Sequence, residues 1–126
     1  MGNEAKNFKI PKSFTLFGHK YDVILSDDLF KTSNCYGLAD DDLKTVTIQK
    51  AAKVAKIYEE EEKEVPFYIT DEVVVETFYH EMTHIILDAI GETKLSENEA
   101  LVNMFGKAWL EIYLSSTYEK DSQEEV

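Results

Sequence analysis

The chain has little cysteine, few basic residues and no long apolar run, and each shortage excludes a class of protein. Cys35 is the single cysteine among 126 residues, so the chain forms no internal disulfide and no thiolate cluster that would compete for a metal. Its 13 Lys and Arg stand against 25 Asp and Glu, which gives a formal net charge of −12. Because this charge repels phosphate backbones, we expect no direct contact with nucleic acid.

The apolar segments are too short to cross a bilayer, and Met1 to Ser13 lacks the apolar stretch of a secretion signal. We therefore expect a cytoplasmic protein that does not bind membranes. The length suits one domain. We predict that this domain covers residues 9–117 and that residues 118–126 form a disordered acidic tail.

The most informative stretch is His80-Glu81-Met82-Thr83-His84, which matches the pattern HExxH. At about 100° of rotation per residue, the two histidines of an α-helix lie about 40° apart on one face, so both imidazoles can bind one zinc ion. Glu81 would then stand beside the ion. There its carboxylate can take a proton from a zinc-activated water molecule and so generate a nucleophile at neutral pH.

The flanking residues predict a helix around this motif. Thr70 supplies an N-cap, Asp71 and Glu72 supply favourable first-turn charge, and Gly91 supplies a left-handed stop. The alternative interpretation is that the histidines are ordinary polar residues on the wet side of an amphipathic helix. Core packing does not explain them, because they lie opposite a broad apolar arc. That arc contains Val74, Val75, Phe78, Met82, Ile85, Ile86 and Ala89.

Four short strands are expected before this helix. Residues 14–17 and 21–25 favour a hairpin around Gly18 and His19, and residues 35–39 and 45–49 flank an Asp-rich turn. Together they predict a small antiparallel sheet, and with the helices an α+β fold.

Two further segments are expected to be helical. Residues 50–64 are alanine-rich and precede Pro66, which predicts a helical insertion that ends in a mobile loop. A last helix is expected to begin at Ser96. Its core-facing stripe would contain Leu101, Phe105, Ala108, Trp109 and Ile112.

A zinc ion held by two histidines and a water needs one more protein ligand, which should come from downstream. Glu99 is the leading candidate, because Asn103 and Gly106 share its helix face. Asn103 can accept a hydrogen bond from a zinc-bound histidine, and Gly106 allows two helices to approach closely.

Three alternatives to this assignment stay open. Glu97 could be the ligand instead, although it projects from nearly the opposite side of the helix. Glu99 could serve only as the N3 residue of a capping box, Ser96-Glu97-Asn98-Glu99. Asp88 could substitute as a ligand, but it shares a helix with both histidines.

HExxH followed by Asn98-Glu99-Ala100 and Asn103 resembles the gluzincin metallopeptidases, and most of all the short ImmA/IrrE-type proteins of phages and prophages. Residues 9–14 and 35–39 also look like those chains, so the resemblance runs from about residue 9 to 115. It implies a minimal zincin-like domain, in which the small antiparallel sheet packs on the HExxH helix and a C-terminal helix.

The resemblance also implies that His80, His84 and Glu99 bind Zn²⁺ and that Glu81 is the general base or acid. The chain departs from the family at Asn103, where an Asp is usual, and in the short connection from His84 to Glu99. Proteins of this type are associated with the cleavage of repressors or regulators.

We predict a zinc-dependent endopeptidase that acts on a protein or peptide, such as a regulatory protein. Glu81 would deprotonate the water and then protonate the leaving amine. Tyr36, Tyr79 and His19 are candidates to stabilise the oxyanion. The strand at residues 45–49 could hold an extended peptide by edge pairing.

The main alternative is a catalytically weak or inactive interaction module of phage or prophage origin, in which zinc staples the last two helices together. A SprT-like protease acting on DNA-bound proteins is disfavoured by the net charge and by the lack of a basic stripe. The sequence determines neither the identity of the substrate nor the oligomeric state.

Overall fold

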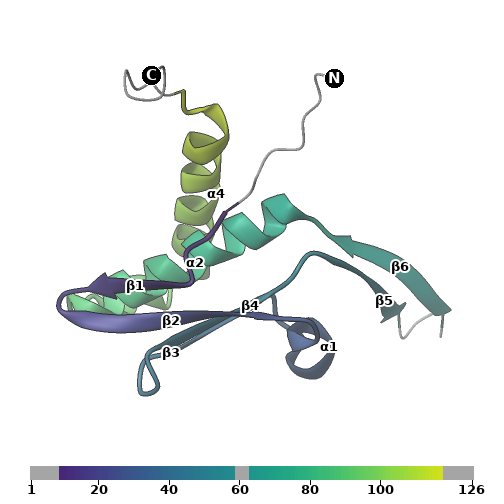
Figure 1. The fold of residues 1–126 in the computed structure, drawn as a ribbon, viewed down its shortest axis with the longest axis horizontal. Coiled ribbons are helices and arrows are strands. Elements are labelled where there is room, and N and C mark those ends of the chain that lie inside the picture. Colours follow the sequence, from purple (N-terminus) through teal and green to yellow (C-terminus); the bar gives the residue numbers. More distant parts are fainter. Residues whose placement is uncertain (1–8, 59–62, 118–126) are drawn as a thin grey trace, which may run out of the picture.

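A computed structural model describes residues 9–58 and 63–117, and the predicted tail at residues 118–126 lies outside them (Figure 1). The described chain is a mixed α+β structure, as predicted. A four-stranded sheet lies under a long helix, and a second long helix stands on the first (Figure 1). No helix in these two ranges has the length and apolar character needed to cross a membrane.

The four-stranded sheet has the order β1-β2-β4-β3. Its strands are β1 (Ser13–Leu16), β2 (His19–Ser26), β3 (Gly37–Asp40) and β4 (Thr45–Gln49). The β1–β2 and β3–β4 pairs are antiparallel, but β2 and β4 are parallel. The prediction of a purely antiparallel sheet is therefore wrong at its central pair.

The position of β4 explains the parallel pair. Val46, Ile48 and Gln49 are almost completely buried, so β4 takes a central place in the sheet. The short helix α1 (Leu29–Ser33) lies between β2 and β3, which lets the chain reach the far edge before it returns as β4. A strand that returns in this way runs in the same direction as β2.

The first hairpin turns one residue earlier than predicted. Leu16 pairs with His19, so Phe17 and Gly18 form the two-residue turn. Their φ angles of 49° and 82° are the positive values that such a turn requires, and Gly18 adopts its value without steric cost.

The predicted helical insertion at residues 50–64 is wrong. The structure has β5 (Ala52–Tyr58) paired in antiparallel fashion with β6 (Lys63–Ile69), in a two-stranded sheet separate from the first. The alanines favour a helix locally, but residues 65 and 67–69 are β-branched or aromatic and belong to a partner strand. Pro66 is tolerated because a two-stranded sheet consists only of edges. Residues 59–62, within the expected mobile loop, lie outside the described chain.

The motif helix, α2 (Asp71–Ala89), begins and ends as predicted. The Thr70 hydroxyl oxygen accepts a hydrogen bond from the Val73 N–H at 3.3 Å, and Gly91 follows the helix with a φ of 82°. One face of α2 packs on the sheet. The buried cluster between them consists of Tyr21, Val46, Ile48, Phe78 and Ile85.

The predicted start of the last helix at Ser96 is wrong. Ser96 ends a short helix, α3 (Thr93–Ser96), and α4 (Glu99–Ser115) begins after it. The Asn98 side chain caps α4 by accepting a hydrogen bond from the Leu101 N–H at 3.1 Å. Glu99 is the first residue of α4 and not its third, so the capping box Ser96-Glu97-Asn98-Glu99 does not form.

The apolar stripe predicted to face the core from α4 is also wrong, because most of its residues are exposed. Phe105, Trp109 and Ile112 are each about half exposed, whereas Val102 and Gly106 are buried. Helix α4 packs on α2 around Gly106 and otherwise projects away from the sheet (Figure 1). In the described chain, the sheet is therefore too far away to cover the outer side of α4.

Candidate metal centre

Helix α2 presents His80 and His84 together. The residues are one turn apart on the same face, and their ring centroids are 4.9 Å apart. Burial, followed by the neighbouring His84 ring, lowers the pKa of His80. A lowered pKa favours the neutral imidazole, which is the form that binds metals.

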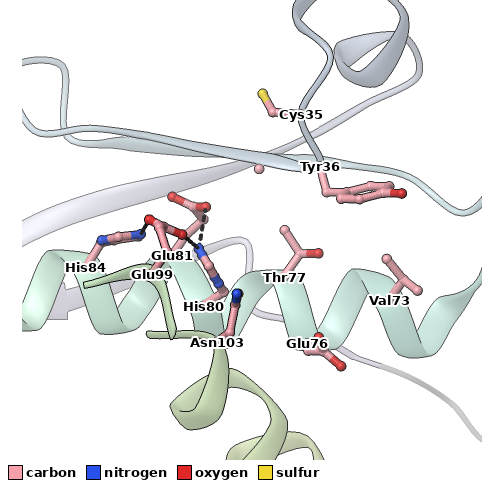
Figure 2. A pocket seen from close by; sticks show the side chains of 11 residues that line it. Cys35, Tyr36, Val73, Glu76, Thr77, His80, Glu81, His84, Glu99 and Asn103 are labelled. Atoms are coloured by element: carbon pink, nitrogen blue, oxygen red, sulfur yellow. Dashed lines mark ion pairs between the residues drawn. The ribbon is translucent and has the colours of Figure 1, made fainter. Parts of the chain in front are cut away.

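Glu99 joins the two histidines from the first residue of α4 (Figure 2). Its Oε2 lies 3.4 Å from His80 Nε2, and its Oε1 lies 3.1 Å from His84 Nε2. One ligand atom from each of the three residues lies within 4.8 Å of the others. Ligands about 2.0–2.1 Å from a tetrahedral zinc ion are about 3.3 Å apart, so the two separations between Glu99 and the imidazole nitrogens suit such an ion.

Two histidines and one glutamate form a donor set used by catalytic zinc sites. Of the described residues, only these three form such a group. Glu97 and Asp88, the alternative ligands considered from the sequence, do not belong to it. The structure therefore brings Glu99, and neither alternative, to the two histidines, while the binding of zinc itself stays a prediction.

Both imidazoles have a hydrogen-bonding partner beyond this group. Ser96 Oγ lies 3.0 Å from His84 Nδ1, and the Ser96 residue is buried. Asn103 lies beside His80 (Figure 2), and a hydrogen bond between the two side chains raises the pKa of His80, which agrees with the contact predicted for this asparagine and a histidine. Such contacts fix the orientation of a ligating ring and leave its other nitrogen directed at the metal.

The role of Ser96 was missed by sequence reasoning. In the sequence Ser96 looks like the first residue of a capping box, and that motif explains a serine fully. The contact with His84 depends on how α3 folds back beside α2, which no local pattern encodes.

Glu81 is directed toward the same group but stands apart from it. The residue is only 9% exposed, and its Oε2 is 4.0 Å from His80 Nε2. Burial raises the pKa of the Glu81 carboxyl, and the nearby Glu99 raises it further. His84 and a hydrogen bond from the Ala39 backbone N–H act in the opposite direction and lower this pKa. A carboxylate with a raised pKa is a better proton acceptor at neutral pH.

Gly37 allows β3 to lie directly against this part of α2. A Cβ at this position would be 2.6 Å from Thr77 Cγ2, 2.9 Å from Glu81 Cγ and 3.2 Å from Glu81 Oε2. All three distances are shorter than ordinary van der Waals contact, so any side chain would displace β3, Thr77 or Glu81. Gly37 was predicted as part of a strand but not as part of the site.

A second glycine sets the distance between the two long helices. A Cβ on Gly106 would be 3.3 Å from the Glu76 backbone oxygen and 3.5 Å from His80 Cα. The predicted close approach at Gly106 is therefore confirmed. It holds the start of α4, and with it Glu99, near the histidines.

The group lies in an open cleft of about 540 Å³ (Figure 2). Three segments line it: the approach to β3, one face of α2, and the first two turns of α4. The lining residues are Cys35, Tyr36, Gly37, Val73, Glu76, Thr77, His80, Glu81, His84, Glu99 and Asn103. A cleft of this size can admit a short extended peptide.

Of the three oxyanion candidates, only Tyr36 lines the cleft. Burial raises the pKa of Tyr36, which keeps its hydroxyl protonated. Tyr79 instead stacks on Trp109, with the ring centroids 5.8 Å apart, between α2 and α4. His19 begins β2 and does not line the cleft.

Comparisons of the chain with protein-family models, with curated proteins and with solved structures found no match. The resemblance to ImmA/IrrE-type proteins therefore stays an expectation from the sequence, based on HExxH, on Asn98-Glu99-Ala100 with Asn103 in place of the usual Asp, and on residues 9–14 and 35–39.

Proposed function

We propose that the protein is a zinc-dependent endopeptidase. The observation that supports this most directly is the convergence of His80, His84 and Glu99 beside a buried Glu81 in an open cleft. The first three residues would hold the ion. A cytoplasmic location and an origin in a phage or prophage are further proposals that rest on the sequence alone.

His80, His84 and Glu99 would hold the ion, which would supply Lewis acidity for polarising a substrate carbonyl and for easing the deprotonation of water. The chain supplies the proton transfers. Glu81 accepts the proton of the attacking water and delivers it to the leaving amine, so that one carboxyl serves both halves of the reaction. Its burial supports this role, because burial brings its pKa closer to neutral pH.

The edge of the sheet offers a place for an extended substrate. The predicted edge pairing at residues 45–49 is wrong, because β4 is paired on both sides, with β2 and β3. β3 is the edge strand next to β4, and β1 forms the other edge of the sheet. The Ala39 N–H donates to Glu81, so the backbone groups of β3 that do not pair with β4 point toward the cleft. The backbone groups of Gly37, two residues earlier in the strand, point the same way. Substrate backbone could therefore pair with β3 beside Glu81.

A second candidate function is the inactive module in which zinc staples two helices. It is favoured by the origin of the ligands, since His80 and His84 belong to α2 and Glu99 belongs to α4. An ion bound there would tie α4 to the rest of the fold whether or not any peptide is hydrolysed.

Replacement of Glu81 by Gln separates the two functions. We expect the Glu81→Gln variant to retain about one zinc per chain and to lose at least about 100-fold in peptide cleavage, because Gln cannot accept the proton. Zinc content is measured by atomic emission, and cleavage is measured by mass spectrometry on a mixture of peptides.

Glu97→Gln is the matched control, because Glu97 loses the same charge near the site but lies outside the metal group. It should retain both zinc and activity. Equal cleavage by the parent and the Glu81→Gln variant would refute the proposed mechanism, and zinc binding without any cleavage by the parent would favour the stapled module.

A further inference from the structure

The cleft continues along α2 beyond the candidate metal ligands. Its α2 residues recur every three or four positions and so form one helix face. Glu76 lies on this face one turn before His80, which corresponds to a rise of about 6 Å. Figure 2 shows Glu76 on the same side of α2 as Asn103, with Tyr36 on the opposite side of the helix.

Charge is unevenly balanced in this cleft. Of the residues that the structure describes, three carboxylates line it, and no Lys or Arg does. Two of them have partners, since Glu99 contacts both imidazoles and Glu81 accepts the Ala39 N–H. The two charges of a zinc ion would also balance these two carboxylates.

Glu76 is the carboxylate of this cleft that has no ion-pair partner. In the described part of the chain it forms no salt bridge, although Lys107 of α4 lines a neighbouring hollow together with Glu76. It is neither fully buried nor fully exposed, so solvent screens its charge only in part. Val73 and Thr77 also line the cleft from α2, on the side of the helix that faces Tyr36, and offer methyl groups to an aliphatic chain (Figure 2).

We infer that this part of the cleft binds a cationic group of the substrate, with Glu76 as its counter-ion. The group is the side chain of a Lys or Arg residue next to the scissile bond, because one helical turn separates Glu76 from the metal ligands. The inference rests on the proposed peptidase function and names its substrate class. The net charge of −12 would also attract cationic peptides to the protein.

The test uses N-acetylated decapeptides that are identical except for one central position, occupied by Lys, Arg, Gln or Glu. The zinc-loaded parent should cleave next to Lys or Arg with a kcat/KM about tenfold higher than next to Gln, as expected for one partly screened charge pair. In Glu76→Gln this ratio should fall below about twofold. Glu72→Gln, which loses the same charge one turn earlier and outside the cleft, should keep the parent ratio.

Two results would overturn the inference and leave the peptidase proposal intact: a parent Lys-to-Gln ratio near one, or a ratio that persists in Glu76→Gln. The ammonium group could also be the N-terminus of a peptide, so the same peptides are tested without the acetyl group. If the cleavage rate depends on the free N-terminus and not on the central Lys, the assignment to a side chain is wrong.

A binding measurement keeps the inference testable if the parent cleaves nothing, in which case the proposed function fails. Fluorescence anisotropy compares labelled Lys and Gln decapeptides on zinc-loaded Glu81→Gln. We expect the Lys peptide to bind about tenfold more tightly, and we expect the difference to vanish in the Glu76→Gln/Glu81→Gln double variant. Equal binding of the two peptides would overturn the inference.

Discussion

Two buried polar side chains, Glu81 and Ser96, lie at the candidate metal centre and act on different partners. Glu81 carries a charge that burial disfavours, and it is held by the Ala39 N–H beside His80 and His84. Ser96 is neutral, and its hydroxyl forms a hydrogen bond with His84 Nδ1. The first residue is therefore suited to proton transfer, and the second is suited to hold a ring in place.

Ser96→Ala should weaken zinc binding about 10- to 100-fold, because His84 loses the contact that fixes its orientation and tautomer. Competition with a chromogenic zinc chelator measures the affinity. Asn98→Ala provides the contrast, since it removes the side-chain cap of α4 two residues later. That variant should lower the free energy of unfolding of the metal-free protein by about 1 kcal/mol.

If Ser96→Ala lowered the free energy of unfolding as Asn98→Ala does but left the zinc affinity unchanged, the contact with His84 would have no role in metal binding. The metal-free Ser96→Ala protein should therefore be examined in the same denaturant titration as Asn98→Ala.

At the scale of elements, the site depends on the approach of β3 to α2. Gly37 is the point of contact, and the space that a Cβ would need is already occupied by Thr77 and Glu81. Leu38, the next residue, is 52% exposed, because adjacent residues of a strand point to opposite faces. A change at Gly37 therefore acts on the site, while a change at Leu38 acts on the outer surface.

Gly37→Ala should destabilise the protein by about 1–3 kcal/mol, because the added methyl group forces β3 and α2 apart. A displacement of Glu81 by about 1 Å should lower kcat/KM about 100-fold. Zinc content should stay unchanged, since the three atoms nearest to the added atom belong to Thr77 and Glu81 and not to a candidate ligand. Leu38→Ala is the control and should keep its activity. Full activity in Gly37→Ala would show that the close contact of β3 with α2 is dispensable for catalysis.

At the scale of the whole molecule, α4 is held mainly by α2. The two helices meet at Gly106, and the candidate metal group forms a second connection between them at Glu99. The outer side of α4 adds little, because Phe105, Trp109 and Ile112 are about half exposed. An ion that joins Glu99 to the histidines should therefore stabilise the whole chain against unfolding.

Saturating zinc, at about 100 times its Kd, should stabilise the folded protein by about 2.7 kcal/mol, which corresponds to a rise of about 10 °C in Tm for a chain of this size. Addition of a chelator should reverse the rise. The shift is measured by differential scanning fluorimetry. Glu99→Ala should lose it, and Glu97→Ala should keep it. A parent protein whose Tm does not respond to zinc or chelator would contradict the candidate metal centre.

The sequence by itself determined the features that depend on neighbouring residues. The caps at Thr70 and Gly91 define α2, and the helical period places His80 and His84 on one face. These features follow from local backbone geometry, which a short segment contains completely. Glu99 could be selected in advance because Asn103 and Gly106 share its helix face, and both make the predicted contacts.

Only the tertiary structure decided the features that depend on distant segments. The alanines of β5 favour a helix until β6 pairs with them, and β4 becomes parallel to β2 because its apolar residues require the centre of the sheet. The contacts of Ser96 with His84 and of Gly37 with Glu81 arise when separate elements fold against each other. Packing between segments far apart in the chain selects among conformations that are similar in local energy, so a local pattern does not reveal them.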